Sequence, residues 1–415
     1  MAGCFDQAKG SLQHAWSPFF TRHGSLTPVQ QQAIPPILDG HNTLVIAPTA
    51  SGKTEAVLAP LLERHVLGAE APRSGEPELR ILYICPTRAL VRDLYERLTP
   101  PLAQLQVTLG MKSGDTGPVP TSRPPVVLIT TPESTDSLLT REPRLLAGLQ
   151  AVVLDEIHLF DGGVRGDHLR CLLRRVEHVR RYSQQQAGVD PPIPLQRIAL
   201  SATIPDPAGV ADRYLADDDA AGAPHIVQAG GGRAIEADVQ PMHGLADLAA
   251  ALALRAGSGL GSRKTLVFCN SRNEVEQVAA YLRQNLPFEA AVFVHYSNLD
   301  PAERRAVEDG FAEASVAICV ASSTLELGID IGSIDDVALV GPPPTLLSFL
   351  QRIGRGGRRT GLTRVLCLPR STLEHTRFSA LLALAQSAPR SPLPAPSLPA
   401  FRPSVLVQQT FSLLK

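Results

Sequence analysis

The run Ala47-Pro-Thr-Ala-Ser-Gly-Lys-Thr54 lies between an apolar run and an apolar stretch with helical spacing. Backbone N–H groups of such a loop, together with the N-terminus of the following helix, favour phosphate groups. Lys53 adds a positive charge, and Thr54 offers a hydroxyl to Mg²⁺. Ala47 and Ala50 stand where glycine is frequent in phosphate-binding loops. The alternative interpretation is an ordinary strand, turn and helix with a surface lysine.

Two further polar segments follow apolar runs. Asp155-Glu156 follows Val152–Leu154, and a carboxylate there can hold Mg²⁺ while its neighbour polarises an attacking water. His158 links the nucleotide state to a second domain, or is a plain loop histidine. Ser201-Ala202-Thr203 offers two hydroxyls that can bond the acidic pair, or else caps a helix before Pro205.

An arginine cluster lies far along the chain, in Gln351-Arg-Ile-Gly-Arg-Gly-Gly-Arg358. Arg352, Arg355 and Arg358 recur every three residues, and the guanidinium fork suits the charge on a transferring phosphate. A basic solvated turn and a site for a nucleic-acid backbone are the alternatives. We favour arginines that act on the first half, because an incomplete phosphate site exists there to receive them. This pairing predicts nucleotide hydrolysis that depends on closure of two domains.

Composition sets the broad class. The 415 residues are 44% hydrophobic, which suits two or three domains with full cores. Lys plus Arg number 39 against 40 Asp plus Glu, so any nucleic-acid surface must be a local patch. The six cysteines form no Cys-x-x-Cys pair, which disfavours zinc, an iron–sulfur cluster and a disulfide framework. No signal pattern and no run of about 18 apolar residues occurs, so we expect a cytoplasmic protein without membrane contact.

Short apolar runs alternate with longer amphipathic stretches, twice over. We expect ten strands, at Thr43–Ala47, Ile81–Cys85, Val126–Thr130, Ala151–Leu154, Arg197–Leu200, Thr265–Cys269, Ala291–His295, Val316–Val320, Val337–Val340 and Arg364–Leu368. Helical spacing lies between them, at Ala89–Leu98, His168–Val179, Glu274–Leu286 and Ala302–Phe311. The alternation predicts an α/β fold with two tandem parallel sheets of doubly wound type.

We expect domains at residues 1–240 and 241–386. Residues 387–415 are proline-rich and then take helical spacing, which predicts an extended linker and a short terminal helix. Gly68–Glu78 and Gln184–Pro194 have the composition of surface loops.

Together these segments resemble superfamily 2 helicases, and within them the DExH-type, Lhr-like (large helicase-related) group, from about Ser25 to Leu368. The segments that carry the likeness, in the family's order, are Thr27–Gln30, Ala47–Thr54, Pro86–Leu90, Thr131–Ser134, Asp155–His158, Ser201–Thr203, Leu266–Arg272, Ala321–Asp330 and Gln351–Arg358. Val164–Leu169, Ser323–Asp330 and Ser348–Arg355 look most Lhr-like. The resemblance implies two RecA-like domains, an ATP-binding domain and a helicase C-terminal domain.

The resemblance also implies roles for single residues, with ATP and Mg²⁺ as cofactors. Catalysis would fall to Lys53, Asp155, Glu156 (the base), Arg355 and Arg358. Nucleotide contacts would come from Gln30 (reading adenine), Thr49, Ala50, Ser51, Gly52, Lys53, Thr54, Gly328, Asp330 and Gln351. Thr54 and Asp155 would serve the metal, and strand contacts would come from Thr87, Arg88, Thr131, Ser271 and Thr324.

The implied activity is ATP hydrolysis stimulated by nucleic acid, driving 3′ to 5′ movement along single-stranded DNA or a tailed duplex. An RNA or RNA–DNA hybrid helicase, and a nucleotide-gated clamp that does not unwind, are the alternatives. A metabolic kinase is disfavoured, since it has no use for a second parallel sheet with its own arginines. Lhr-like proteins usually continue into a winged helix, and Ser404–Lys415 resembles the start of one. Protein partners cannot be identified from the sequence.

Overall fold

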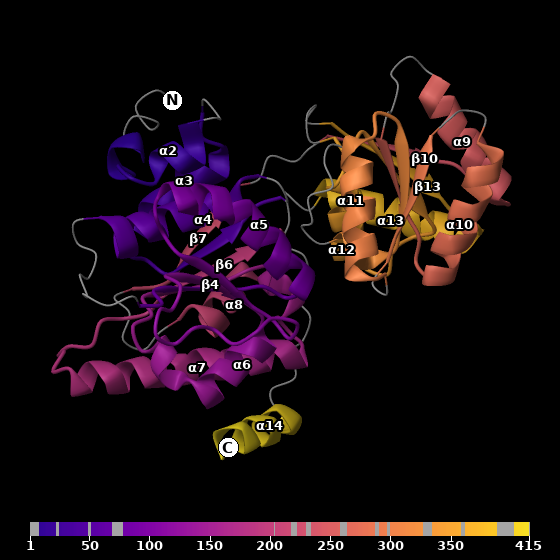
Figure 1. The fold of residues 1–415 in the computed structure, drawn as a ribbon. Coiled ribbons are helices and arrows are strands. Elements are labelled where there is room, and N and C mark those ends of the chain that lie inside the picture. Colours follow the sequence, from indigo (N-terminus) through magenta and orange to yellow (C-terminus); the bar gives the residue numbers. More distant parts are fainter. Residues whose placement is uncertain are drawn as a thin grey trace. The chain divides into compact units, whose positions relative to one another are not determined.

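The computed structural model forms two compact units, Met1–Gly230 with Leu393–Lys415, and Gly231–Pro392 (Figure 1). The structure describes residues 8–21, 25–48, 51–68, 78–202, 204–216, 222–229, 234–257, 264–286, 290–296, 299–326, 334–357, 362–387 and 402–414. Each unit is built around one parallel sheet, which confirms the predicted fold class.

The first unit contains a seven-stranded sheet in the order β3-β4-β2-β5-β6-β1-β7. Its strands are β1 (Thr43–Ile46), β2 (Ile81–Ile84), β3 (Leu109–Lys112), β4 (Val127–Thr130), β5 (Ala151–Leu154), β6 (Gln196–Ser201) and β7 (His225–Gln228). Neighbouring strands pair in parallel, for example with Val45 opposite Leu200 and Leu82 opposite Val152. The central strands are fully buried, because helices cover both faces.

The helices of the first unit lie on the two faces of this sheet (Figure 1). One face carries α4 (Lys53–Leu62) and α5 (Arg88–Gln104), and the other carries α6 (Pro132–Arg141), α7 (Val164–Gln186) and α8 (Pro207–Tyr214). Leucine and valine side chains of α6, α7 and α8 form one core with β2, β5 and β6. Shorter or flanking elements are α2 (Trp16–Phe20), α3 (Pro28–Leu38), the π-helical η2 (Glu63–Leu67), and the 3₁₀ turns η3 (Pro143–Leu146) and η4 (Ile157–Leu159).

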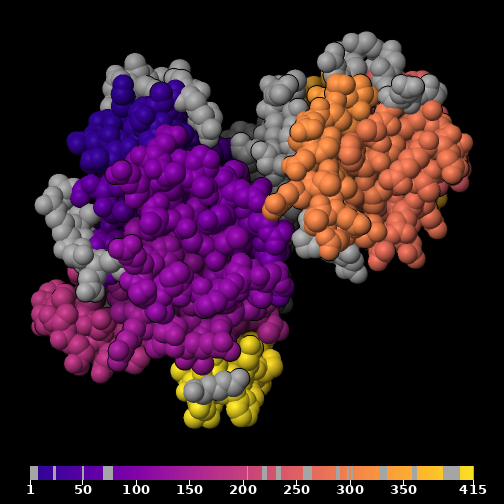
Figure 2. Space-filling model, in the orientation of Figure 1, coloured from indigo at the N-terminus to yellow at the C-terminus, as the bar shows by residue number. Residues whose placement is uncertain are grey.

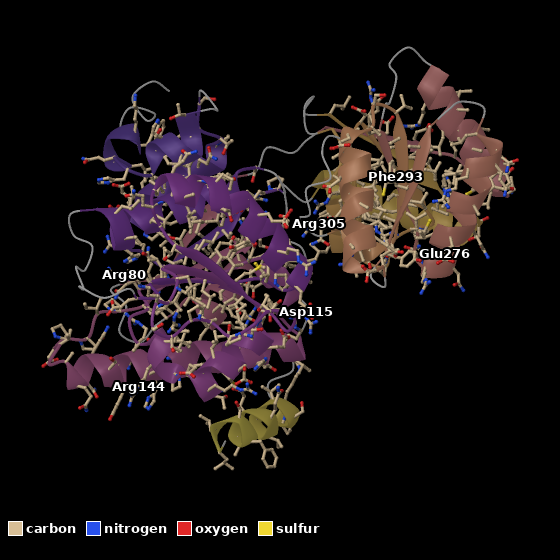
Figure 3. The ribbon with its side chains drawn as sticks, in the orientation of Figure 1. Arg80, Asp115, Arg144, Glu276, Phe293 and Arg305 are labelled. Carbon is tan, nitrogen blue, oxygen red and sulfur yellow. The ribbon has the colours of Figure 1, made fainter. Side chains whose placement is uncertain are left out.

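The second unit contains a six-stranded parallel sheet in the order β10-β11-β9-β12-β13-β8. Its strands are β8 (Ala234–Val239), β9 (Lys264–Phe268), β10 (Ala291–His295), β11 (Ala317–Ala321), β12 (Asp336–Val340) and β13 (Leu362–Leu368). Its helices are α9 (Leu245–Gly257), α10 (Arg272–Asn285), α11 (Pro301–Glu313), the 3₁₀ turn η5 (Ser323–Glu326), α12 (Leu346–Ile353) and α13 (Thr372–Ser387). Phe293 of β10, labelled in Figure 3, meets Phe311 of α11 edge to face at 5.9 Å.

All ten predicted strands are present, and three more occur. These are β3, β7 and β8, and each lies at an edge of its sheet. Because β8 pairs with β13, the second unit begins before residue 240, where we had expected the boundary. Helix α7 continues to Gln186, so the start of the expected loop Gln184–Pro194 is helical. Residues 69–77, most of the other expected loop, lie outside the described residues, as do residues 388–401 of the expected linker.

The predicted terminal helix is α14 (Pro403–Leu413), and it packs on α7 and α6 of the first unit rather than forming a separate segment. In Figure 2 it is the yellow element against that unit. Arg402 donates to the Asp167 carboxylate at 2.6 Å and to the carbonyl oxygen of Gly163 at 3.2 Å. Asp136 of α6 accepts from Ser412 Oγ at 2.7 Å and Gln409 Nε2 at 3.1 Å. No helix in the described part of the chain is both long and apolar enough to cross a membrane.

Candidate nucleotide and strand sites

Three neighbouring strands bring the first group of candidate residues together. In the sheet of the first unit, β5, β6 and β1 lie side by side and run in the same direction. Their carboxyl ends therefore meet at one edge, which is where open α/β sheets bind ligands. Asp155 follows β5, Ser201 ends β6 and Ala47 follows β1, and the Ala47 N–H donates to the Ser201 carbonyl at 3.0 Å.

In the candidate phosphate-binding loop, Lys53 bonds the backbone at Ala47. Lys53, the first residue of α4, is buried and donates from Nζ to the Ala47 carbonyl oxygen at 2.6 Å. Ser51 Oγ donates to the Pro48 carbonyl at 2.7 Å. Gly52 precedes the helix with φ +86°, a left-handed conformation that glycine adopts without steric cost. Thr49 and Ala50 lie outside the described residues.

Gln30 lies against this loop. Thr27 caps α3 in a reciprocal arrangement, and its N–H donates to Gln30 Oε1 at 2.9 Å. The amide of Gln30 reaches the Gly52 carbonyl at 3.4 Å, while the Thr27 hydroxyl donates to the Ser51 carbonyl at 2.9 Å. A Cβ on Gly52 would lie 2.3 Å from Gln30 Nε2. The helix that carries the candidate adenine reader is thus in direct contact with the phosphate-binding loop.

The acidic pair occupies a strained turn. The Glu156 N–H donates to Asp155 Oδ1 at 2.9 Å, and Glu156 adopts φ +46°, which is uncommon outside glycine. Burial and the negative charge of Glu156 together raise the pKa of the Asp155 carboxyl to about 7. The positive charges of Lys53 and Arg97 act in the opposite direction. The pair therefore favours a nearby cation.

His158 and Ser201 contact each other beside this pair. His158 Nδ1 lies 2.8 Å from Ser201 Oγ and 3.4 Å from Glu156 Oε2. Burial lowers the pKa of His158, so the imidazole is neutral at pH 7. Ser201, one of the two hydroxyl residues for which we considered a bond to the acidic pair or a helix cap, thus bonds the histidine that follows the pair. Thr203 lies outside the described residues.

The oxygen donors at this edge fit a magnesium ion. Mg²⁺ prefers oxygen ligands and is commonly held by one or two carboxylates together with phosphate oxygens. The carboxylate of Asp155 and the hydroxyl of Thr54 supply such atoms. Arg97 of α5, which the sequence analysis did not single out, donates from Nη2 to Thr54 Oγ1 at 3.1 Å. This contact joins residues 43 positions apart, so no local sequence pattern shows it.

In the second unit, the two arginines of the cluster that the structure describes are buried and bond Glu326 in different ways. Arg352 is buried, donates to Glu326 Oε1 at 2.8 Å and to Asn270 Oδ1 at 2.9 Å, and so holds its own unit together. Arg355 is also buried and donates from Nη2 to the Glu326 carbonyl at 2.7 Å. Gln351 precedes Arg352 in α12 and is buried. Arg358, Gly328 and Asp330 lie outside the described residues.

The residues expected to contact the nucleic-acid strand lie mainly at the starts of helices. Thr87, Thr131 and Ser271 are the N-caps of α5, α6 and α10, each accepting a backbone N–H three residues on. Arg88 pairs at 2.7 Å with Asp115, which is labelled in Figure 3. Thr324 Oγ1 lies 2.8 Å from His295 Nδ1. A helix start presents N–H groups to anions, so the caps are compatible with phosphate contact.

Comparisons with known proteins agree with this geometry. A DEAD/DEAH box helicase model matches residues 27–210, and a helicase conserved C-terminal domain model matches residues 248–360. The chain is 33% identical over 371 residues to ATP-dependent helicase Lhr-Core protein 2 of Thermococcus barophilus, covering 82% of this chain and 41% of the relative. It is 33% identical over 367 residues to ATP-dependent helicase Lhr-Core of Methanocaldococcus jannaschii, with the same two coverages. The chain thus spans about two fifths of the length of these relatives.

A solved structure of Mycobacterium smegmatis helicase Lhr bound to ssDNA and AMP-PNP superposes with a TM-score of 0.77. Its sequence identity is 29%, and the match covers 96% of this chain and 52% of that one. Fold and site together define a two-domain RecA-like helicase core of superfamily 2. Within that superfamily the chain belongs to the Lhr-like group.

Proposed function

We propose that this chain is an ATP-driven motor that moves along single-stranded DNA in the 3′ to 5′ direction. The observation that carries the proposal is the convergence of Lys53, Asp155 and Glu156 at one sheet edge, next to the buried Gln30. The similar helicase Lhr of Mycobacterium smegmatis was solved with ssDNA and AMP-PNP, which supports both ligands.

In the proposed reaction Lys53 leaves the Ala47 carbonyl and binds the phosphates, and Gln30 selects adenine. Thr54 and Asp155 would hold a Mg²⁺ ion, which would neutralise charge on the phosphates. Glu156 orients and deprotonates the attacking water. Ser51, Gly52 and the neighbouring Thr49 and Ala50 supply the loop, while Gly328 and Asp330 border the ribose.

The second unit completes the site in this proposal. Gln351, Arg355 and Arg358 approach the phosphates when the units close, and the arginines stabilise the charge of the transition state. Hydrolysis then releases the closed state. Thr87, Arg88, Thr131, Ser271 and Thr324 hold the strand through its backbone, so binding is insensitive to sequence and weakens with salt.

The test is ATP turnover with single-stranded DNA, single-stranded RNA, blunt duplex, tailed duplex and RNA–DNA hybrid, with Lys53→Ala as the inactive control. We expect single-stranded and 3′-tailed DNA to stimulate turnover, and the tailed duplex to be unwound. Stimulation by RNA or hybrid alone would replace the DNA assignment. Stimulated turnover without strand separation would indicate a translocase or clamp, and no stimulation by any of the five would reject the proposed function.

A further inference from the structure

Arg165, the second residue of α7, lies where three segments of the first unit meet. Its Nη2 donates to the Pro86 carbonyl oxygen at 2.8 Å, and its Nε donates to Glu133 Oε1 at 3.0 Å. The centre of the guanidinium lies 5.1 Å from the centroid of the Phe160 ring. Arg165 belongs to the segment Val164–Leu169, which resembles the Lhr-like group and contains none of the residues given a role in the proposed function.

The position of Arg165 depends on the turn after the acidic pair and on Gly166. After the acidic pair the chain makes the η4 turn, and Gly163 donates to the Phe160 carbonyl at 3.0 Å before α7 begins. A Cβ on Gly166 would lie 2.3 Å from the Phe160 carbonyl oxygen and 2.6 Å from the Tyr214 hydroxyl. Only glycine therefore lets α7 start so close to Phe160, and this approach brings Arg165 over the ring.

The two hydrogen bonds of Arg165 reach the turns that precede α5 and α6, where Thr87 and Thr131 are proposed to contact the nucleic-acid strand. Pro86 immediately precedes Thr87 at the end of β2, and Glu133 lies in the first turn of α6, two residues after Thr131. Because β2 and β4 are neighbouring parallel strands, the two turns are adjacent at the same sheet edge. A planar guanidinium fork can bond both at once, whereas an ammonium is a single point charge.

We infer that Arg165 is a positioning residue for strand binding, which fixes the spacing of the Thr87 and Thr131 turns and ties it to the helix that follows the acidic pair. This inference rests on the proposed function, since it requires the strand to lie across those turns. Arg165 acts through the turns and through α7, so its removal weakens the strand contact without altering the nucleotide pocket around Lys53.

The experiment compares Arg165→Ala with Arg170→Ala, an exposed arginine on the same helix whose pairing at 3.7 Å is with Asp167. Fluorescence anisotropy of a labelled deoxythymidine oligonucleotide gives the affinity for single-stranded DNA. ATP turnover is then measured while the DNA concentration is varied, which gives the DNA concentration for half-maximal stimulation, and while the ATP concentration is varied, which gives the KM for ATP. For Arg165→Ala we expect strand affinity to fall about tenfold, roughly the loss of one charge-assisted hydrogen bond. The strand concentration for half-maximal stimulation rises equally, and the KM for ATP stays within about twofold.

A second variant guards against misfolding of α7. Glu133→Gln keeps an acceptor for Arg165 while removing the charge, and we expect a smaller loss in the same direction. Strand affinity of both variants equal to wild type overturns the inference, as does a rise in the KM for ATP that matches the loss of strand affinity. If single-stranded DNA does not stimulate ATP turnover by the wild-type protein, the proposed function fails instead. That failure can be distinguished from failure of the inference on Arg165, because it is seen without any variant.

Discussion

Replacing Gly52 by alanine tests how the candidate phosphate-binding loop is coupled to α3, which carries the proposed adenine reader Gln30. The residue has φ +86°, and its new Cβ would lie 2.3 Å from Gln30 Nε2. The left-handed backbone costs about 1.5 kcal/mol for an L-residue. Displacing Gln30 removes its bonds to Thr27 and Gly52, which contribute about 1.5 kcal/mol in total. We therefore expect Gly52→Ala to lower the free energy of unfolding by about 3 kcal/mol.

A double-mutant cycle separates the two parts. Gln30→Ala alone costs about 1.5 kcal/mol, because it removes the same bonds. The double variant should cost about 3 rather than 4.5 kcal/mol, since no amide remains to be displaced. Trp16, the one tryptophan of the chain, is buried in the first unit, so its fluorescence in urea reports unfolding of that unit. Additive costs, or wild-type stability of Gly52→Ala, would refute the coupling.

The remaining predictions concern the acidic pair, the buried arginine and the terminal helix. Asp155 has a pKa of about 7 in the folded protein against 3.8 in the unfolded chain, so its folded form holds a proton that the unfolded chain loses, and stability falls from pH 4 to 7. In EDTA, Asp155→Asn should lose this decline and be more stable than wild type at pH 8 in urea unfolding. Arg352→Ala should destabilise the second unit by about 3 kcal/mol through the buried Glu326 charge, with part recovered by adding Glu326→Ala, as measured by thermal unfolding. Arg402→Ala should remove amide exchange protection from α14, while equal protection would show that Arg402 does not hold this helix.

The nine strands inside the two sheets were all predicted, as was the edge strand β10, whereas the edge strands β3, β7 and β8 were missed. Central strands such as β2 and β5 are continuous apolar runs because both faces are buried. By contrast β3 is only partly buried, and β7 exposes three of its four residues. An edge strand needs no apolar run, so its sequence carries little signal. Because β8 was missed, the expected boundary near residue 240 fell after this strand, which pairs with β13 and so belongs to the second unit.

The sequence predicted the place in the fold of candidate site residues that local spacing marks out. Lys53, Asp155 and Gln30 fall at strand ends and helix starts, as their segments indicated. Arg97 and Arg165 were not singled out, because each contacts a residue far along the chain: Arg97 contacts Thr54, and Arg165 contacts Glu133 where α6 packs against α7. The expected strand contacts Thr87 and Thr131 proved to be helix caps, a second use of the same hydroxyls that residue type alone does not separate.

The central claim is that neither unit owns a complete catalytic set. The most direct measurement compares ATP turnover and nucleotide affinity in Arg355→Ala, with Arg355→Lys alongside and thermal unfolding to check the bond to the Glu326 carbonyl. We predict that strand-stimulated turnover falls by about 10³-fold, the usual worth of an arginine finger, while affinity for a fluorescent ATP analogue stays within about fivefold. Wild-type turnover in a folded Arg355→Ala protein would contradict the claim.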